Sequence, residues 1–185
     1  MTCIVGIIDR KNKEIIVGGD SAGVSGIDIA KRRDTKVFIK DNRFLIGFTS
    51  SFRMGQILHY SDLYVPEQEE CEDELAFMIK KFVPAVITLF EKHNWGQKYT
   101  SGDARGGTFI VGYKDKMFQV MDDFQVEESY KCYTACGCGE SYALGSFFSS
   151  THLTQAERVA EALRCAEEFS GGVSSPFVIK KLKFI

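Results

Sequence analysis

The amino-acid sequence predicts one α+β domain in which antiparallel sheets carry helices on their outer faces. Strand-sized apolar runs occur in groups and helical patterns occur in pairs, in the order four strands, two helices, strands, two helices and a last strand. Alternating βαβ units would interleave the two kinds of element, so this grouping favours antiparallel sheets. We find no internal repeat or low-complexity linker, and a chain of this length suits a single domain over residues 1–185.

The predicted strands begin directly after the first two residues. Residues 3–8 and 15–17 are apolar without alternation, which indicates strands that are covered on both faces. The polar residues 9–13 between them are typical of a hairpin turn. Residues 24–29 read as strand or loop. Further strands are expected at residues 36–40, 44–49, 107–113, 117–120 and 176–182.

Four helices are expected, and the clearest lies at residues 73–91, where apolar side chains recur at helical spacing. Pro84 should kink or split this helix, because proline cannot donate a main-chain hydrogen bond. Residues 94–105 after it read as a polar loop. The other helices are expected at 52–60, from near Glu140, and from Thr154, which has capping-box spacing to Glu157.

Composition excludes several classes of function. The net charge is −2 and the one basic cluster is Lys31 to Arg33, so nucleic-acid binding has little support. The apolar stretches are too short to span a membrane, and the N-terminus lacks a signal-peptide pattern. The six cysteines therefore predict reduced thiols in the cytoplasm. Cys132, Cys136 and Cys138 lack a usual zinc spacing, so we expect buried free thiols, no metal and no cofactor.

Thr2 is the first candidate for catalysis. A small residue at position two allows Met1 to be removed, which would leave threonine at the N-terminus. Such a threonine carries a nucleophilic hydroxyl and, in its own α-amine, a base. An α-amine has a reference pKa of roughly 7.7–8.0, so it can accept a proton near neutral pH.

Two charged residues complete the candidate site. Asp20 ends the second predicted strand and Lys36 begins the third. The side chain of Lys36 shares a face with that of Phe38, so its ammonium is expected in a packed layer, where it needs a carboxylate partner. A lysine beside the Thr2 hydroxyl would favour the ionised oxygen, and Asp20 would hold that lysine.

Together, Thr2, Asp20 and Lys36 resemble the catalytic threonine, aspartate and lysine of the proteasome β-subunit family of N-terminal-nucleophile hydrolases, in order and spacing. Gly47 is similar to the family glycine whose backbone N–H forms the oxyanion hole. Ser170, which is followed by two glycines, resembles the family's serine-glycine-glycine. The resemblance covers residues 2 to about 182, is strongest to the simple bacterial proteasome-like threonine peptidase, and implies a four-layer αββα sandwich with two antiparallel sheets.

The sequence departs from the family pattern at several positions. Cys3 replaces a second threonine, and the first hairpin is two residues longer than usual. Cys138 stands where the family has an active-site serine, and Glu167 stands where it has an aspartate. A thiol replaces a hydroxyl only weakly in hydrogen bonding. Glu167 falls on the buried stripe of its helix, so it either pairs with a cation such as the N-terminal amine or reaches water at the edge of the stripe.

The resemblance implies a threonine-type endopeptidase or amidohydrolase. Its partners would be a peptide or unfolded protein as substrate, copies of this chain in a homo-oligomeric ring, and an ATP-dependent unfoldase. Leu45 and Thr49, which flank Gly47, are expected to line the pocket for a substrate side chain.

Two other readings stay open. The family fold also occurs in catalytically inactive structural subunits, and a chain that keeps Met1 would have no free threonine amine. Separately, Gly19 to Gly23 fit the G-x-S-x-G nucleophile elbow of serine hydrolases, with Ser21 as nucleophile and His152 as base. That motif requires a helix after Ser21, whereas the residues that follow read as strand or loop.

Overall fold

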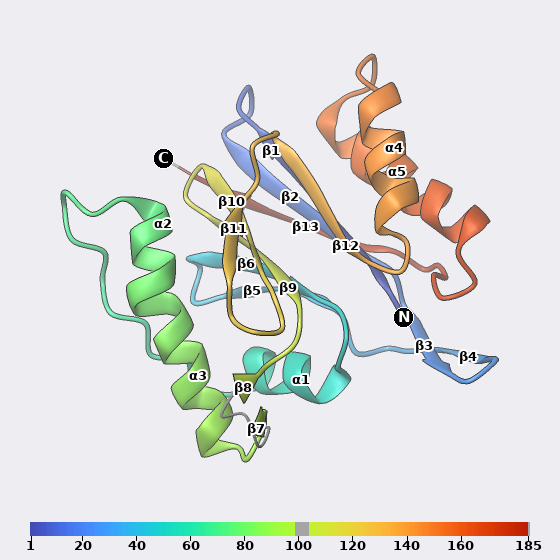
Figure 1. Cartoon of the computed structure of the whole chain (residues 1–185). Helices are drawn as coiled ribbons and strands as arrows, with labels where there is room; N and C mark the ends of the chain where they lie inside the picture. Colours follow the sequence, from blue (N-terminus) through green and yellow to red (C-terminus); the bar gives the residue numbers. More distant parts are fainter. Residues whose placement is uncertain (99–103, 185) are drawn as a thin grey trace.

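The computed structural model describes residues 1–98 and 104–184, and two antiparallel sheets face one another at its centre. The first sheet has four strands and the second has five, with the helices packed outside them (Figure 1). The first sheet runs in the order β12 (Tyr133–Gly137), β1 (Cys3–Asp9), β2 (Glu14–Gly19) and β13 (Val178–Lys183). The second runs in the order β11 (Val126–Glu128), β10 (Lys116–Val120), β9 (Phe109–Tyr113), β6 (Phe44–Phe48) and β5 (Val37–Lys40).

Helices cover both outer faces, which gives four layers in the order α, β, β, α. Helices α4 (Glu140–Ser149) and α5 (Gln155–Phe169), orange to red in Figure 1, cover the first sheet. Helix α1 (Phe52–Tyr60) and the longer α2–α3 helix cover the second. This arrangement confirms the predicted α+β fold. Within the described residues, every helix is too short or too polar to cross a membrane.

The strands are apolar on both faces because each sheet is buried on both faces. In β1, Ile4 and Ile8 pack between the sheets, whereas Cys3, Val5 and Ile7 pack under α4 and α5. The second sheet alternates in the same way, and its outer side chains are mostly aromatic. Burial of this kind contributes about 1.5–3 kcal/mol for each large apolar side chain, so the three apolar layers hold the strand ends, and the site built on them, in place.

The predicted 73–91 helix is continuous but changes register. It consists of α2 (Glu74–Phe77), a π-helical turn at Met78–Phe82 and α3 (Val83–Lys92). The π turn ends at Phe82, two residues before Pro84, which has no N–H to donate to the preceding turn. The capping box at Thr154 is also confirmed, with both of its hydrogen bonds formed.

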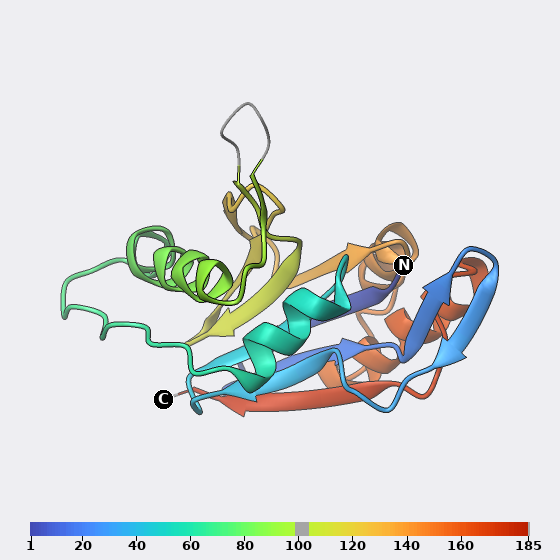
Figure 2. The ribbon, with the colours of Figure 1, turned by 90° about the horizontal axis from the view of Figure 1, so that it is seen from below.

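Several strands differ from those expected. Residues 24–29 form part of a separate hairpin, β3 (Ala22–Ser25) and β4 (Asp28–Lys31), which projects beyond the sheets close to the N-terminus (Figure 2). Strands β11 and β12 were not predicted. The expected loop at 94–105 contains β7 (Gln97–Lys98) and β8 (Ala104–Arg105), and its residues 99–103 lie outside the described part.

Candidate active site

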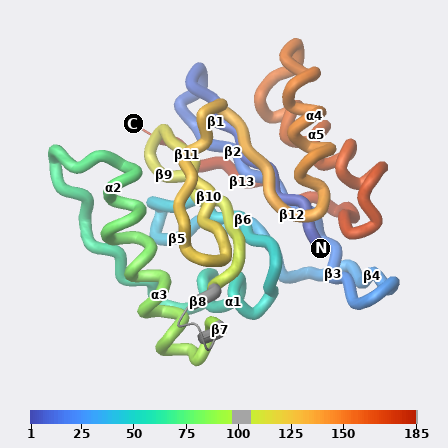
Figure 3. The backbone as a smooth tube through the Cα atoms, viewed as in Figure 1, coloured from blue at the N-terminus to red at the C-terminus, as the bar shows by residue number. Residues whose placement is uncertain are grey.

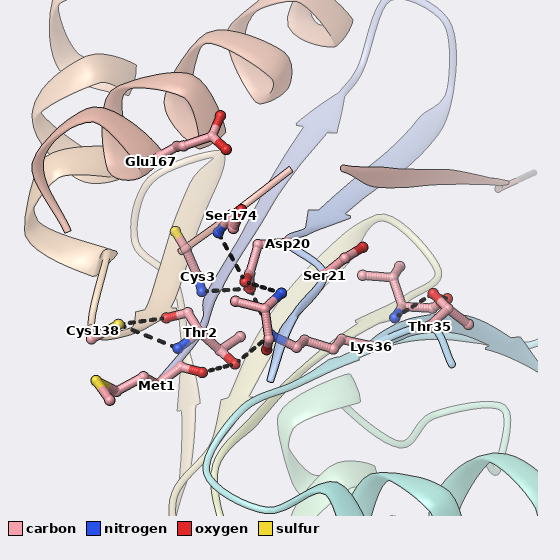
Figure 4. Close-up of polar contacts among 12 residues, drawn as sticks. Met1, Thr2, Cys3, Asp20, Ser21, Thr35, Lys36, Cys138, Glu167 and Ser174 are labelled. Atoms are coloured by element: carbon pink, nitrogen blue, oxygen red, sulfur yellow. Dashed lines mark hydrogen bonds and ion pairs between the residues drawn. The ribbon is translucent and has the colours of Figure 1, made fainter. Parts of the chain in front are cut away.

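Thr2 lies immediately before β1, where the chain start meets the end of β12 and the base of the β3–β4 hairpin (Figure 3). Only 3% of its surface is exposed. Its Oγ1 accepts a hydrogen bond from Lys36 Nζ at 2.8 Å and donates one to the Met1 carbonyl at 2.5 Å (Figure 4). The predicted contact between the threonine hydroxyl and a lysine ammonium is therefore present in the structure.

Lys36 and Asp20 form a buried pair beside this hydroxyl. Lys36 Nζ donates to Asp20 Oδ1 at 2.9 Å and to the Ala22 carbonyl at 2.7 Å, and the Lys36 side chain is 2% exposed. Asp20 follows β2 directly and also accepts from the amides of Cys3 at 3.0 Å and Ala22 at 2.8 Å. These amides fix the carboxylate, and the carboxylate fixes the lysine, so the pair is held rigidly against Thr2.

Burial lowers the pKa of Lys36, and the charge of Asp20 and its hydrogen bond act in the opposite direction. Desolvation disfavours a buried ammonium, whereas an adjacent carboxylate favours it. The protonation of Lys36 therefore depends on Asp20. Because Lys36 lies one residue before β5, strand alternation does not set the direction of its side chain.

Cys138 contacts the other side of Thr2, at the end of β12. Its Sγ accepts a hydrogen bond from the Thr2 main-chain nitrogen at 3.2 Å and lies 3.4 Å from the Thr2 carbonyl oxygen. The Ser170 hydroxyl donates to the same sulfur at 3.3 Å. A Cβ on Gly172 would lie 2.7 Å from this sulfur, so the second glycine after Ser170 permits the close approach. Cys138 and Ser170 thus both belong to the candidate site.

Glu167 does not contact Thr2. Its Oε1 accepts a hydrogen bond from the Ser175 amide at 2.6 Å, and Figure 4 shows its carboxylate directed away from the threonine. Of the two expectations for this half-buried residue, pairing with the N-terminal amine is therefore wrong. The side chain instead holds the segment that leads into β13. Sequence spacing placed it on the correct helix but could not show which way the carboxylate points.

Gly47 also does not fit its expected role. It lies inside β6, opposite Val37 of β5 on one side and Ile110 of β9 on the other, so its amide belongs to the sheet. A Cβ at this position would lie 2.6 Å from Ile4, which explains the glycine by the close contact between the two sheets.

Ser50 is a better source of a free amide. It has φ of +66° directly before Ser51, the N-cap of α1, and within the described residues its N–H donates no hydrogen bond. Its hydroxyl is fixed, because it donates to the Thr49 carbonyl at 2.6 Å and accepts from the Thr108 amide at 3.0 Å. Ser51 was the sequence signal, since an N-cap serine marks where the strand has ended and amides become free.

A small cavity adjoins Thr2, with a volume of about 80 Å³. Thr49 lines it as expected, whereas Leu45 packs between the sheets and does not. Its other walls are Met1, Thr2, Val24, Phe48, Ser50, Ser51 and Phe52.

The alternative chemistries gain no support from the geometry. Ser21 is followed by β3 and not by a helix, and its hydroxyl donates to the Pro176 carbonyl at 2.6 Å. Of the three cysteines expected to be buried, only Cys136 is, and Cys132 and Cys138 are exposed. Within residues 1–98 and 104–184, no group of three or more metal-ligating side chains comes together.

Known proteins resemble this chain in three-dimensional structure but not detectably in sequence. No protein-family model and no curated protein sequence matches the chain. Among solved structures, BPH of Thiobacillus denitrificans in complex with epoxomicin superposes with a TM-score of 0.77 at 17% identity over the whole of both chains. A second structure of the same BPH superposes with a TM-score of 0.79 at 18% identity, over 100% of this chain and 99% of the BPH chain.

The eukaryotic HslV from Trypanosoma brucei gives a TM-score of 0.67 at 16% identity, over 98% of this chain and 99% of its own. Likeness at this level of identity concerns the fold. It confirms the architecture that the resemblance implied. The chain has the fold of HslV and of the bacterial proteasome homologue BPH.

Proposed function

We propose that this protein is an N-terminal-nucleophile threonine peptidase in which Thr2, freed by removal of Met1, attacks a peptide or related amide bond. The observation that carries the proposal is the 2.8 Å contact between Thr2 Oγ1 and the Lys36 ammonium, which Asp20 holds in place at 2.9 Å. A buried lysine directed at a threonine hydroxyl is costly unless the charge has a use or a partner, and here it has both.

In the proposed reaction, the Thr2 α-amine accepts the hydroxyl proton as Oγ1 attacks the substrate carbonyl carbon. Lys36 stabilises the developing negative charge on the oxygen, and Asp20 keeps Lys36 protonated. The amine then protonates the leaving nitrogen, an ester forms on Thr2, and water hydrolyses this ester. Cys138 and Ser170 orient the amine, since the Thr2 nitrogen already lies 3.2 Å from the Cys138 sulfur.

The oxyanion donor in this proposal is the Ser50 amide. Ser50 lines the cavity beside Thr2, and no other described group takes its N–H. One such donor is typically worth about 2.7–4 kcal/mol in the transition state. The fixed hydroxyl of Ser50 holds a backbone conformation with positive φ that a serine seldom adopts.

The wider assembly belongs to the same proposal. HslV and BPH share the fold, and on that likeness we propose a homo-oligomeric ring that encloses the Thr2 sites and receives unfolded polypeptide from an ATP-driven unfoldase. Sedimentation of the purified chain tests the ring independently of activity.

A catalytically inactive structural subunit is the second candidate, and one observation favours it. With Met1 in place, the Thr2 nitrogen is a peptide nitrogen and its hydroxyl is engaged by the Met1 carbonyl. In that state the base that the mechanism needs does not exist.

Intact mass of the purified protein separates the two candidates. The sample is measured before and after a threonine-directed electrophile, with epoxomicin as the first choice because a structural neighbour binds it. Loss of Met1 and one adduct mapped to Thr2 support the peptidase, and Thr2→Ala is the matched control. Retention of Met1 with no adduct supports the inactive subunit.

A further inference from the structure

Three consecutive cations, Lys31, Arg32 and Arg33, stand at the end of the β3–β4 hairpin, whose Val24 lines the Thr2 cavity, and the proposed mechanism uses none of them. Lys31 ends β4 opposite Ala22, whose carbonyl accepts from the catalytic Lys36. The Arg32 amide donates to the Ser21 carbonyl at 2.8 Å. The base of the β3–β4 hairpin therefore places Lys31 and Arg32 next to the segment that contacts Lys36.

The Arg32 guanidinium is held in a fixed position against Phe52, a residue that lines the cavity. Its central carbon lies 3.8 Å from the centre of the Phe52 ring, and Phe52 lines the cavity together with Thr2. Asp34 accepts two hydrogen bonds from the guanidinium, from Nε to Oδ1 at 2.8 Å and from Nη2 to Oδ2 at 2.6 Å. Stacking and a bidentate carboxylate are the two contacts that immobilise an arginine best.

One nitrogen of this arginine is left without a partner. Nη1 donates to no group within the described residues, and the side chain is 34% exposed. An arginine that is immobilised, with one nitrogen left free to donate, is well prepared to bind a carboxylate.

The surrounding charge is positive as well. Asp34 balances Arg32, and Asp20 balances Lys36, but Lys31 and Arg33 are exposed and form no ion pair within the described part of the chain. Arg53, on the first turn of α1 beside Phe52, is exposed too and forms no ion pair with any residue that the structure describes. The whole chain carries −2, so this local excess is a property of the site and not of the protein.

We propose that the site prefers peptides with an acidic side chain close to the scissile bond, whose carboxylate binds Arg32 Nη1, with Lys31 and Arg33 attracting it to the cavity. This substrate class rests on the proposed function. The preference is electrostatic and should weaken as salt screens the exposed cations.

The test uses pairs of fluorogenic peptides that differ only by Glu or Gln at one of the three positions before the cleaved bond. At low ionic strength, kcat/KM for the Glu member should exceed that for the Gln member by about fivefold at one position. About 0.5 M NaCl should bring the ratio close to one, since the Debye length then falls to a few ångströms. Arg32→Gln should bring the Glu-to-Gln ratio of kcat/KM to about one, and Arg33→Gln should reduce it.

Arg10→Gln is the matched control, because Arg10 also pairs with an aspartate, Asp115 at 3.1 Å, but at the far end of β1 from Thr2. It should leave the Glu-to-Gln ratio unchanged. A wild-type ratio at or below one at every position, or one that high salt, Arg32→Gln and Arg33→Gln all leave intact, overturns the inference. If Thr2 still takes up the electrophile in that case, the proposed function survives. If Thr2 neither hydrolyses a peptide nor forms an adduct, both proposals fail.

Discussion

The contacts on the two sides of Thr2 differ in burial and in hydrogen-bond length. On the Lys36 side, a charged pair is almost completely buried, and the hydrogen bonds that Lys36 donates measure 2.7–2.9 Å. On the Cys138 side, the contacts run through a partly exposed sulfur at 3.2–3.4 Å. Hydrogen bonds between charged groups are roughly twice as strong as neutral ones, and a thiol is a weak partner.

This difference indicates where the proposed chemistry tolerates variation. The hydroxyl must be stabilised as an alkoxide, which demands a fixed charge, whereas the amine needs only to be oriented. This chain therefore has Cys138 where the family pattern has a serine, and its Glu167 carboxylate lies away from Thr2. Lys36 and Asp20 match the pattern. Variants on the two sides should rank accordingly.

Lys36→Met should have the largest effect. It removes the ammonium from Thr2 Oγ1 and should slow the formation of the Thr2 adduct by about 10³-fold. It also leaves Asp20 buried without its cation, which typically costs about 3–5 kcal/mol of stability. Adduct rates and urea unfolding measure the two effects.

Lys40→Met is the matched control for that variant. Lys40 is also buried, but its Nζ donates to the Ser61 carbonyl, away from Thr2. Its adduct rate should stay near wild type despite some loss of stability. Equal adduct rates in the two variants would mean that Lys36 does not activate the hydroxyl.

Asp20→Asn should change the pH dependence as well as the rate. The Asp20 charge raises the pKa of Lys36 against the effect of burial, so its removal lowers that pKa further. The protonated lysine exists below its pKa, and the alkaline limb of kcat/KM should therefore move to lower pH. A profile measured from about pH 6 to about pH 10 shows the shift. An unchanged alkaline limb would separate Lys36 from the step being observed.

The Lys36 side, which is the more buried one, was also the easier one to predict from sequence. Thr2, Asp20 and Lys36 sit at strand ends, and strands that are apolar on both faces locate those ends well. Strand β12, which carries Cys138 to Thr2, was missed because its five residues include a cysteine and a glycine and lack a long apolar run. Gly47 was assigned by its similarity to the family glycine, but it lies inside β6 and is paired with both neighbouring strands.

Cys138→Ser should have a moderate effect and in the favourable direction. A hydroxyl oxygen accepts a hydrogen bond from the Thr2 nitrogen better than sulfur does, and a net gain of about 0.5–1.5 kcal/mol corresponds to roughly two- to tenfold in adduct rate. Cys138→Ala should fall below wild type, giving the order Ser, Cys, Ala. A Ser variant no faster than Ala would show that this side chain does not orient the amine.

Variants of Glu167 should have the smallest effect on adduct formation. Its carboxylate accepts from the Ser175 amide and does not contact Thr2, so Glu167→Gln keeps an acceptor and should change adduct formation less than twofold. Glu167→Ala leaves the amide without its partner and should cost about 1 kcal/mol of stability, seen in urea unfolding, with the adduct rate still close to wild type. If Glu167→Gln alone slowed the adduct by an order of magnitude, the negative charge would be acting on the Thr2 amine. The weaker side of the site would then extend from Cys138 into α5.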